Sequence, residues 1–189
     1  MGALDTLLSR VSVSSLLEPA PSGAVLDRIL EAGSRAPDHG HLTPWRFVLI
    51  RGEARSALAD IVGKALRDRD PEAPDAVIEK QRGKFLRAPL VIALGARIRS
   101  NHKIPELEQY MSVAAATMNL LNAIHAEGFG GIWVTGANAS DPAVQAALGF
   151  VAPDTLVGFL FVGTPAAPAG SARRAALADY VTEWTGAVS

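Results

Sequence analysis

One polar segment separates the first long helical pattern of this 189-residue chain from its first apolar run: Gly33-Ser34-Arg35-Ala36-Pro37-Asp38-His39-Gly40-His41-Leu42-Thr43-Pro44-Trp45-Arg46-Phe47. Its two prolines prevent a helix from running through it, since each lacks an N–H and biases the preceding residue toward extended angles. The segment is therefore predicted to be a stiff loop. Stiff loops that carry charged and aromatic side chains between regular elements are frequent places for binding groups.

Three interpretations of this loop are open from its own residues. It is a helix-to-strand connection whose Trp45 enters the core, or a metal site in which His39 and His41 act with Asp38, or a recognition site for a planar polar cofactor. In the third case Arg35 and His39 supply hydrogen-bond donors.

Composition narrows the class of protein. Hydrophobic residues make up 49% of the chain and charged residues 20%, which is typical of a globular domain, and we expect one domain over residues 1–189. The formal net charge of −1 argues against binding to nucleic acid or to an anionic membrane. Cysteine is absent, so redox chemistry requires a bound cofactor. Neither a secretory pattern nor an apolar run of membrane length occurs, and the expected compartment is the cytoplasm.

Periodicity predicts mixed α and β structure. Apolar residues recur at helical spacing in four long stretches and in shorter ones near residues 4–9 and 142–148. Continuous apolar runs predict strands that are buried on both faces at residues 46–51, 89–96 and 156–163. The longest helix is predicted over residues 105–128, and its alanines and methionines suit either a core helix or a subunit interface.

Three further patterns each allow a structural and a functional interpretation. Residues 9–15 combine Arg10 with hydroxyl side chains, which suits a phosphate site or a solvated connection. The glycines of residues 128–136 lack the strand-then-helix order of a dinucleotide fingerprint. They fit either a flat ring against the backbone or a helix terminator beside a core Trp133. The basic residues between Lys80 and Arg87 form a solvated helix face or attract the phosphates of a nicotinamide cofactor.

Taken together, these motifs resemble the nitroreductase family of FMN-dependent oxidoreductases. The resemblance extends from about residue 2 to about residue 165 and rests on matching residues in the same order: Arg10, Ser12, Arg35-Ala36-Pro37-Asp38-His39, Pro44-Trp45-Arg46-Phe47, Asn101-His102-Lys103, Gly128-Phe129-Gly130-Gly131-Ile132-Trp133, Val157-Gly158-Phe159-Leu160 and Gly163-Thr164-Pro165.

The resemblance implies an α+β fold with a central, mainly antiparallel sheet wrapped by helices, in an intertwined homodimer that binds FMN at its interface. It implies that residues 164–189 form a C-terminal extension on the partner subunit. The cofactor-binding residues that it implies are Arg10, Val11 and Ser12 at the phosphate and ribityl chain, Arg35 and His39 from the partner subunit, and Gly131, Ile132 and Trp133 beside the isoalloxazine ring. It assigns the chemistry to the flavin, with no catalytic side chain and no metal.

The function that the resemblance implies is electron transfer from NAD(P)H to a small nitroaromatic, quinone or related acceptor by a ping-pong mechanism. Two alternatives stand beside it: a flavin enzyme with one dedicated substrate, and a flavin-binding or storage protein with little turnover. The storage-protein alternative is motivated by departures of this chain from the family pattern. Family relatives carry basic residues where this chain has Val11 and Ser15, and a glutamine where it has Thr43.

Overall fold

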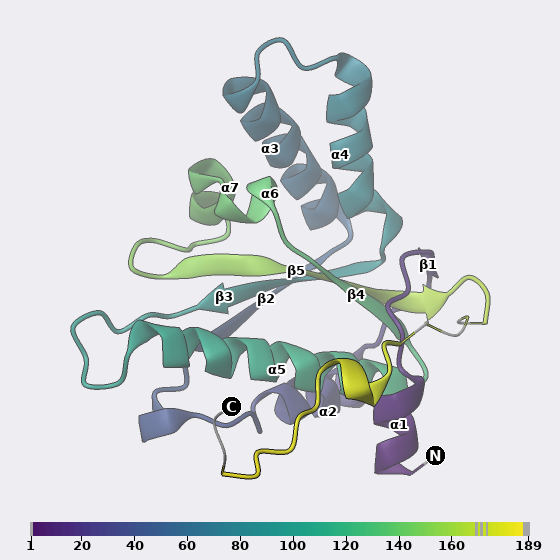
Figure 1. Cartoon of the computed structure of the whole chain (residues 1–189). Coiled ribbons are helices and arrows are strands. Elements are labelled where there is room, and N and C mark those ends of the chain that lie inside the picture. Colours follow the sequence, from purple (N-terminus) through teal and green to yellow (C-terminus); the bar gives the residue numbers. More distant parts are fainter. Residues whose placement is uncertain (1, 169, 171, 173, 187–189) are drawn as a thin grey trace.

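The computed structural model describes residues 2–168, 170, 172 and 174–186, and its centre is a sheet built around one long strand (Figure 1). Strand β5 (Thr155–Pro165) pairs with β3 (Leu90–Ala96), β4 (Gly130–Val134) and the short β1 (Leu16–Leu17). Strand β2 (Trp45–Arg51) joins the other side of β3. All four pairings are antiparallel, so the predicted antiparallel sheet is confirmed.

Helices cover both faces of this sheet, as Figure 1 shows. One face is covered by α2 (Gly23–Gly33) and by the 21-residue α5 (Glu106–Ala126). The other face carries α3 (Glu53–Arg69), α4 (Asp75–Arg87), α6 (Ala137–Ser140) and α7 (Pro142–Ala147). The short α1 (Ala3–Ser9) contacts α5. Two 3-10 turns, η1 (His39–His41) and η2 (Leu177–Asp179), complete the described elements.

Strand β3 shows why the sheet needs both helical layers. Its residues alternate between the two faces, as side chains in a strand must. Val91 and Ala93 pack with α3 and α4, whereas Leu90, Ile92 and Leu94 pack with α2 and α5. Every residue of β3 is buried, as its apolar run predicted. Each fully buried leucine or isoleucine contributes about 1.5–3 kcal/mol to folding.

The prediction for residues 46–51 was wrong in one respect. They form β2, but only Ile50 is buried and Leu49 is 40% exposed. The physical reason is topological: β2 pairs only with β3 and therefore lies at an edge, where the helical layers no longer cover it fully. An apolar run reports hydrophobicity, and it does not distinguish an edge strand from a central one.

The helix ends are explained by local chemistry. Asp141 caps α7, because its Oδ1 accepts hydrogen bonds from Ala143 N at 2.9 Å and Val144 N at 3.2 Å. Ser22 lies at the N-cap of α2, yet its side chain makes no capping hydrogen bond. Residues 1, 169, 171, 173 and 187–189 of the expected domain and its C-terminal extension lie outside the described residues.

Candidate functional site

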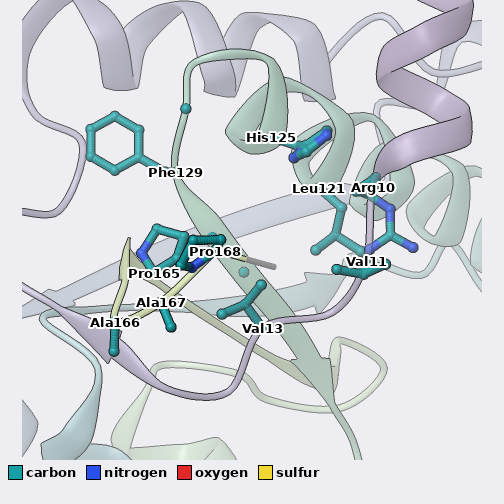
Figure 2. Close-up of a pocket in the computed structure, with 13 residues that line it drawn as sticks. Arg10, Val11, Val13, Leu121, His125, Phe129, Pro165, Ala166, Ala167 and Pro168 are labelled. Atoms are coloured by element: carbon teal, nitrogen blue, oxygen red, sulfur yellow. The ribbon is translucent and has the colours of Figure 1, made fainter. Parts of the chain in front are cut away.

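A pocket of about 480 Å³ lies where α5 ends and β4 begins (Figure 2). Its walls come from four segments: the chain after α1, the last turns of α5, the glycine-rich entry to β4, and the chain after β5. The lining residues are Arg10, Val11, Val13, Leu121, His125, Gly128, Phe129, Gly130, Gly131 and residues 165–168. Pockets that bind cofactors usually have volumes of about 300–1,000 Å³.

Glycines and one backbone hydrogen bond shape this pocket. Gly128 turns the chain out of α5 with a φ of 83°, which side-chain-bearing residues rarely adopt. The amide of Val13 donates to the carbonyl of Gly131 at 3.1 Å and holds the N-terminal segment along β4. At Gly130 an added Cβ would lie 3.0 Å from both Leu16 Cδ2 and Pro165 Cγ. The close approach of these segments therefore depends on glycine.

Arg10 is the charged group of the pocket. Its Nε and Nη1 atoms are buried, and neither finds a hydrogen-bond partner among the described residues. Burial lowers the pKa of Arg10, and the nearby Arg174 lowers the pKa further. A buried guanidinium with unpaired donors is unfavourable unless an anion joins it. The arrangement fits a phosphate or carboxylate ligand.

His125 lies beside Arg10 at the same end of α5 (Figure 2). Its Nε2 is 2.9 Å from the hydroxyl of Ser9, the last residue of α1. This contact links α1 to α5 and fixes the start of the segment that carries Arg10. His125 was not predicted from the sequence, because a histidine in the last turn of a helix commonly only complements the helix dipole.

Three of the sequence-predicted residues meet in this pocket, namely Arg10, Val11 and Gly131. Ser12 is exposed and does not line it. Ile132 points to the opposite face of the sheet, where it lines a second cavity of about 260 Å³. Trp133 packs with the α2 and α5 side, and its indole N–H has no partner in the described part of the chain.

Arg35 and His39 lie elsewhere. Arg35 pairs with Glu31 at 2.7 Å, and His39 Nδ1 is 2.5 Å from Glu108 Oε2 in the first turn of α5. Glu108 precedes His125 by seventeen residues on that helix. At 1.5 Å per residue, His39 is therefore about 25 Å along the helix axis from the Arg10 pocket. One chain does not bring the two predicted groups together.

The loop of residues 33–47 is a helix-to-strand connection with a 3-10 turn. The Asp38 carboxylate shapes it by accepting hydrogen bonds from the amides of Leu42 at 3.1 Å and Thr43 at 2.7 Å. Trp45 is only half-buried. Across the described residues, no cluster of three or more histidine, aspartate and glutamate side chains is arranged to hold a metal ion.

Sequence comparison identifies the class of protein that has this pocket. The Nitroreductase family profile matches residues 7–164, which includes all of the pocket segments up to β5. The chain belongs to the nitroreductase family.

The nitroreductase-family relatives match along most of their length. "Putative NAD(P)H nitroreductase YdjA" of Escherichia coli is 44% identical over 165 residues, which are 87% of this chain and 89% of YdjA. A nitroreductase-like protein from Bacillus cereus has a similar structure, with a TM-score of 0.84, 22% identity, and coverage of 98% of this chain and 97% of that one. A nitroreductase from Desulfovibrio desulfuricans, solved in complex with FMN, gives a TM-score of 0.73 at 24% identity, with 96% of each chain covered.

Within this nitroreductase-family chain, the structure adds pocket residues that the sequence did not indicate. Pro168 had no interpretable signal, and Phe129 belonged to a motif that carried the family resemblance, without an assigned role. Arg174 does not line the pocket but contacts Arg10, and in the sequence it belongs to the basic pair Arg173-Arg174 of an otherwise nearly neutral tail. Pro165 belonged to a motif that carried the family resemblance, without an assigned role. No described helix combines the length and the apolar character needed to cross a membrane.

Proposed function

We propose that this protein is an FMN-dependent oxidoreductase that takes electrons from NAD(P)H and reduces a small nitroaromatic, quinone or related acceptor. The observation that carries the proposal is that Arg10, which lines a pocket of cofactor size, has two buried nitrogen atoms without a hydrogen-bond partner among the described residues. The FMN complex of the Desulfovibrio relative supports the cofactor, and the name of YdjA supports the electron donor.

The residues around Arg10 fit the phosphate end of FMN. The Nε and Nη1 atoms of Arg10 are unpaired donors on different edges of one planar guanidinium, and either edge could donate a charge-assisted hydrogen bond to a phosphate. The backbone of Val11, which lines the pocket, follows directly in the chain and would complete this end of the site. The hydroxyl of Ser12 is exposed outside the lining and would reach the phosphate only from the rim.

The ring end would lie along β4. This strand pairs with β5 on one side, and on its other side the carbonyl of Gly131 meets the amide of Val13. Backbone groups alternate between the two edges of a strand, so the amide of Trp133 faces the same open edge as Gly131. The amide of Gly131 and the backbone N–H and C=O of Trp133 would therefore face the polar edge of a flavin. Ile132 lies between them in the strand, and its own backbone groups face β5.

A second copy of the chain would complete the site. On α5 an apolar stripe is exposed, with Leu107 at 67%, Met111 at 61% and Met118 at 41%. These residues lie on one face of the helix, and such a stripe is typical of a subunit interface. In a two-fold dimer with antiparallel α5 helices, the His39 end of one subunit meets the Arg10 end of the other. The separation of about 25 Å within one chain is then bridged by the partner.

The C-terminal extension also exposes apolar side chains, among them Tyr180 at 64% and Trp184 at 80%. Burial of such aromatic surface against the partner would stabilise the dimer. This is the role proposed for the described part of residues 164–189.

When bound, FMN would supply the two-electron chemistry that connects NAD(P)H to the acceptor. The side chains of this protein would bind and orient the cofactor and the substrates, and would exchange protons with them. Glu108 can accept a hydrogen bond from Nδ1 of His39, which would support the doubly protonated ring and leave its Nε2–H free. We propose that this Nε2 proton is given to the acceptor, after which solvent returns a proton to His39. Unchanged acceptor reduction by flavin-replete His39→Ala would exclude that role.

The visible absorption spectrum of the purified protein tests the proposal, before and after anaerobic addition of NADPH, with the released cofactor identified. Bound FMN whose absorption bleaches on addition of NADPH is the expected result. Bound flavin that keeps its absorption would instead favour a storage protein or a dedicated electron donor. Protein that is colourless and does not bind added FMN would contradict the proposal.

A further inference from the structure

A third cavity, of about 190 Å³, lies between the α3–α4 hairpin (residues 53–87) and the segment that ends β4. One wall comes from α3 and α4, the opposite wall comes from residues 134–138, and Phe159 and Phe161 of β5 line it between them. Val134, the first residue of the second wall, directly follows Trp133, and it lies about 3.3 Å further along the strand. The cavity therefore adjoins the ring end of the proposed flavin site.

Arg69 joins the two walls of this cavity. It is the last residue of α3, and two different nitrogens of its guanidinium are used: Nη1 pairs with Asp141 Oδ2, and Nη2 donates a hydrogen bond to Asn138 Oδ1 at 3.1 Å. Helix α6, which carries Asn138, and helix α7, which Asp141 caps, both lie beside α3 (Figure 1). Of the ion pairs among the described residues, only this one connects the hairpin to another part of the chain.

Asp141 is a firm anchor for this contact. Its side chain is only 6% exposed, and its second oxygen, Oδ1, is held by the amides that it caps in α7. Exposed ion pairs are mobile and screened by salt, whereas a pair with a buried, hydrogen-bonded carboxylate has one fixed geometry. Arg69 therefore sets the separation between α3 and the start of α7.

The turn between β4 and α7 has few other constraints. Thr135 and Gly136 are exposed, and a Cβ added to Gly136, which has a φ of 109°, would meet nothing within 4 Å. The backbone hydrogen bonds of the turn are local: the amides of Ala139 and Ser140 donate to the carbonyl of Gly136 at 2.9 and 3.4 Å. Its position relative to the hairpin thus depends largely on the Arg69 guanidinium.

We infer that Arg69 is a positioning residue: it fixes the turn of residues 135–140 against α3 and thereby holds the end of β4 in place for the flavin ring. This inference rests on the proposed function, because it takes β4 as the strand that contacts the ring. Arg69 acts through Asn138 and Asp141 on the backbone of the turn. A displacement of about 1 Å in the groups around reacting atoms can cost a hundredfold in rate, even when the substitution lies far from them.

Stopped-flow reduction of the FMN-loaded protein at saturating NADPH tests the inference. Arg69→Ala should lower the limiting rate of flavin reduction about 10-fold to 100-fold. The Kd for FMN should stay within about twofold of wild type, because the phosphate end of the site is untouched. Arg69→Lys should lose less, since an ammonium can still pair with Asp141 but cannot also span to Asn138. Asn138→Ala keeps the ion pair and should lose less than Arg69→Ala, so it serves if Arg69→Ala does not fold.

Arg82→Ala is the matched control. Arg82 belongs to the same hairpin, and its side chain is 34% exposed, against 32% for Arg69. Its two carboxylate partners, Asp60 and Glu79, both lie within the hairpin. Arg82→Ala should therefore be reduced at the wild-type rate.

Hydrogen exchange of the flavin-free protein gives a second measurement that does not depend on activity. The amides of Ala139 and Ser140 should exchange at least about tenfold faster in Arg69→Ala, because the turn opens more often once it is released from α3. Their exchange should be unchanged in Arg82→Ala.

Three results would overturn the inference: a limiting rate of Arg69→Ala within twofold of wild type, an equal loss in Arg82→Ala, or unchanged exchange in the turn. Each of these contradicts only the role of Arg69, provided that NADPH reduces the wild-type flavin. Wild-type protein whose flavin is not reduced contradicts the proposed function, and hydrogen exchange then decides alone whether Arg69 fixes the turn.

Discussion

Basic side chains lie near both ends of helix α5, but the two ends differ in how these side chains are compensated. At the C-terminal end, Arg10 has two buried nitrogen atoms without partners among the described residues and lies beside a second arginine. At the N-terminal end, His39 meets the carboxylate of Glu108, and both side chains are substantially exposed.

Because of this difference, the two ends of α5 suit different binding partners. The C-terminal end has donors without an acceptor, so it is suited to bind an anion. The N-terminal end is already compensated by its own carboxylates, so it is suited to contact a neutral ring or another protein surface at little electrostatic cost. In the proposed dimer both ends contribute to one site, because two chains that pack with α5 antiparallel bring them together.

The largest effect is expected from a charge placed on the exposed stripe of α5. Met111→Glu should raise the dimer dissociation constant by at least about a hundredfold, because a two-fold interface contains the substitution twice and each buried side chain contributes about 1.5–3 kcal/mol. Sedimentation velocity across a concentration series measures it. Val77→Glu, on the exposed face of α4, is the control and should leave the dimer intact. A dimer that survives Met111→Glu would refute the proposed packing.

The next largest effect is expected on the affinity for FMN, which should depend on Arg10 far more than on Arg35. Arg10→Ala should weaken FMN binding by about 10-fold to 150-fold, which corresponds to the 1.5–3 kcal/mol of a hydrogen bond to a charged group. Arg35→Ala, which removes an exposed guanidinium already paired with Glu31, should weaken FMN binding by only about threefold, in the range of an exposed ion pair. Equal losses in fluorescence titrations with FMN would contradict the assignment of the phosphate to the C-terminal end.

A third substitution, Asp141→Asn at the cap of α7, tests whether a change in stability can leave cofactor binding unchanged. Burial favours the neutral form of Asp141, yet the hydrogen bonds from Arg69 and from the amides of Val144 and Ala143 outweigh it and leave the pKa below its usual value. Since the folded-state pKa is depressed, the stabilisation is present above the unfolded-state pKa of about 3.9 and is lost as the pH falls through the folded-state value.

Asp141→Asn should therefore lower the free energy of unfolding by about 1–2 kcal/mol at pH 7 and reduce the loss of stability below about pH 4. Urea unfolding at several pH values measures both, and FMN affinity should not change. Asp68→Asn removes an exposed carboxylate that pairs with Lys64, and it should cost less than about 0.5 kcal/mol. Equal costs for the two variants would contradict the buried cap.

The smallest effect concerns the pair at the N-terminal end. A double-mutant cycle with Glu108→Gln and His39→Ala should give a coupling energy of about 0.2–1 kcal/mol in unfolding experiments, because both side chains are partly exposed. A larger effect of Glu108→Gln on acceptor reduction than on stability would indicate that Glu108 positions His39 for proton transfer. A coupling energy of zero would show that the contact does not persist in solution.

Much of the fold could be predicted from local patterns. The buried strand at β3, the long helix α5 and the capped helix α7 each follow from their own residues, because periodicity and capping are local properties. The edge position of β2 could not be predicted, since it depends on which strands pair.

The candidate site was predicted only in part, for a related reason. Arg10 could be marked as a candidate phosphate ligand, beside the alternative of a solvated connection, because hydroxyl residues surround it in the sequence, and the structure places it in the pocket. His125 and residues 165–168 reach the pocket from other elements, and only the folded chain places them there. Arg174 belongs to a tail with little regular structure, so no periodic pattern marked it.

The walls of the Arg10 pocket consist largely of glycine, alanine and proline, which has a consequence for mutagenesis. Substitution by alanine removes little from Gly128, Gly130, Gly131, Ala166 or Ala167, so an alanine scan would report mainly on Arg10, His125, Leu121 and Phe129. Substitutions that add atoms are the informative ones. Valine at position 130 would meet Leu16 and Pro165, whereas the Cβ at position 128 meets nothing within 4 Å and is opposed only by its φ of 83°. Tolerance to larger residues should therefore differ sharply between neighbouring glycines, and a saturation library would map the pocket by its steric limits.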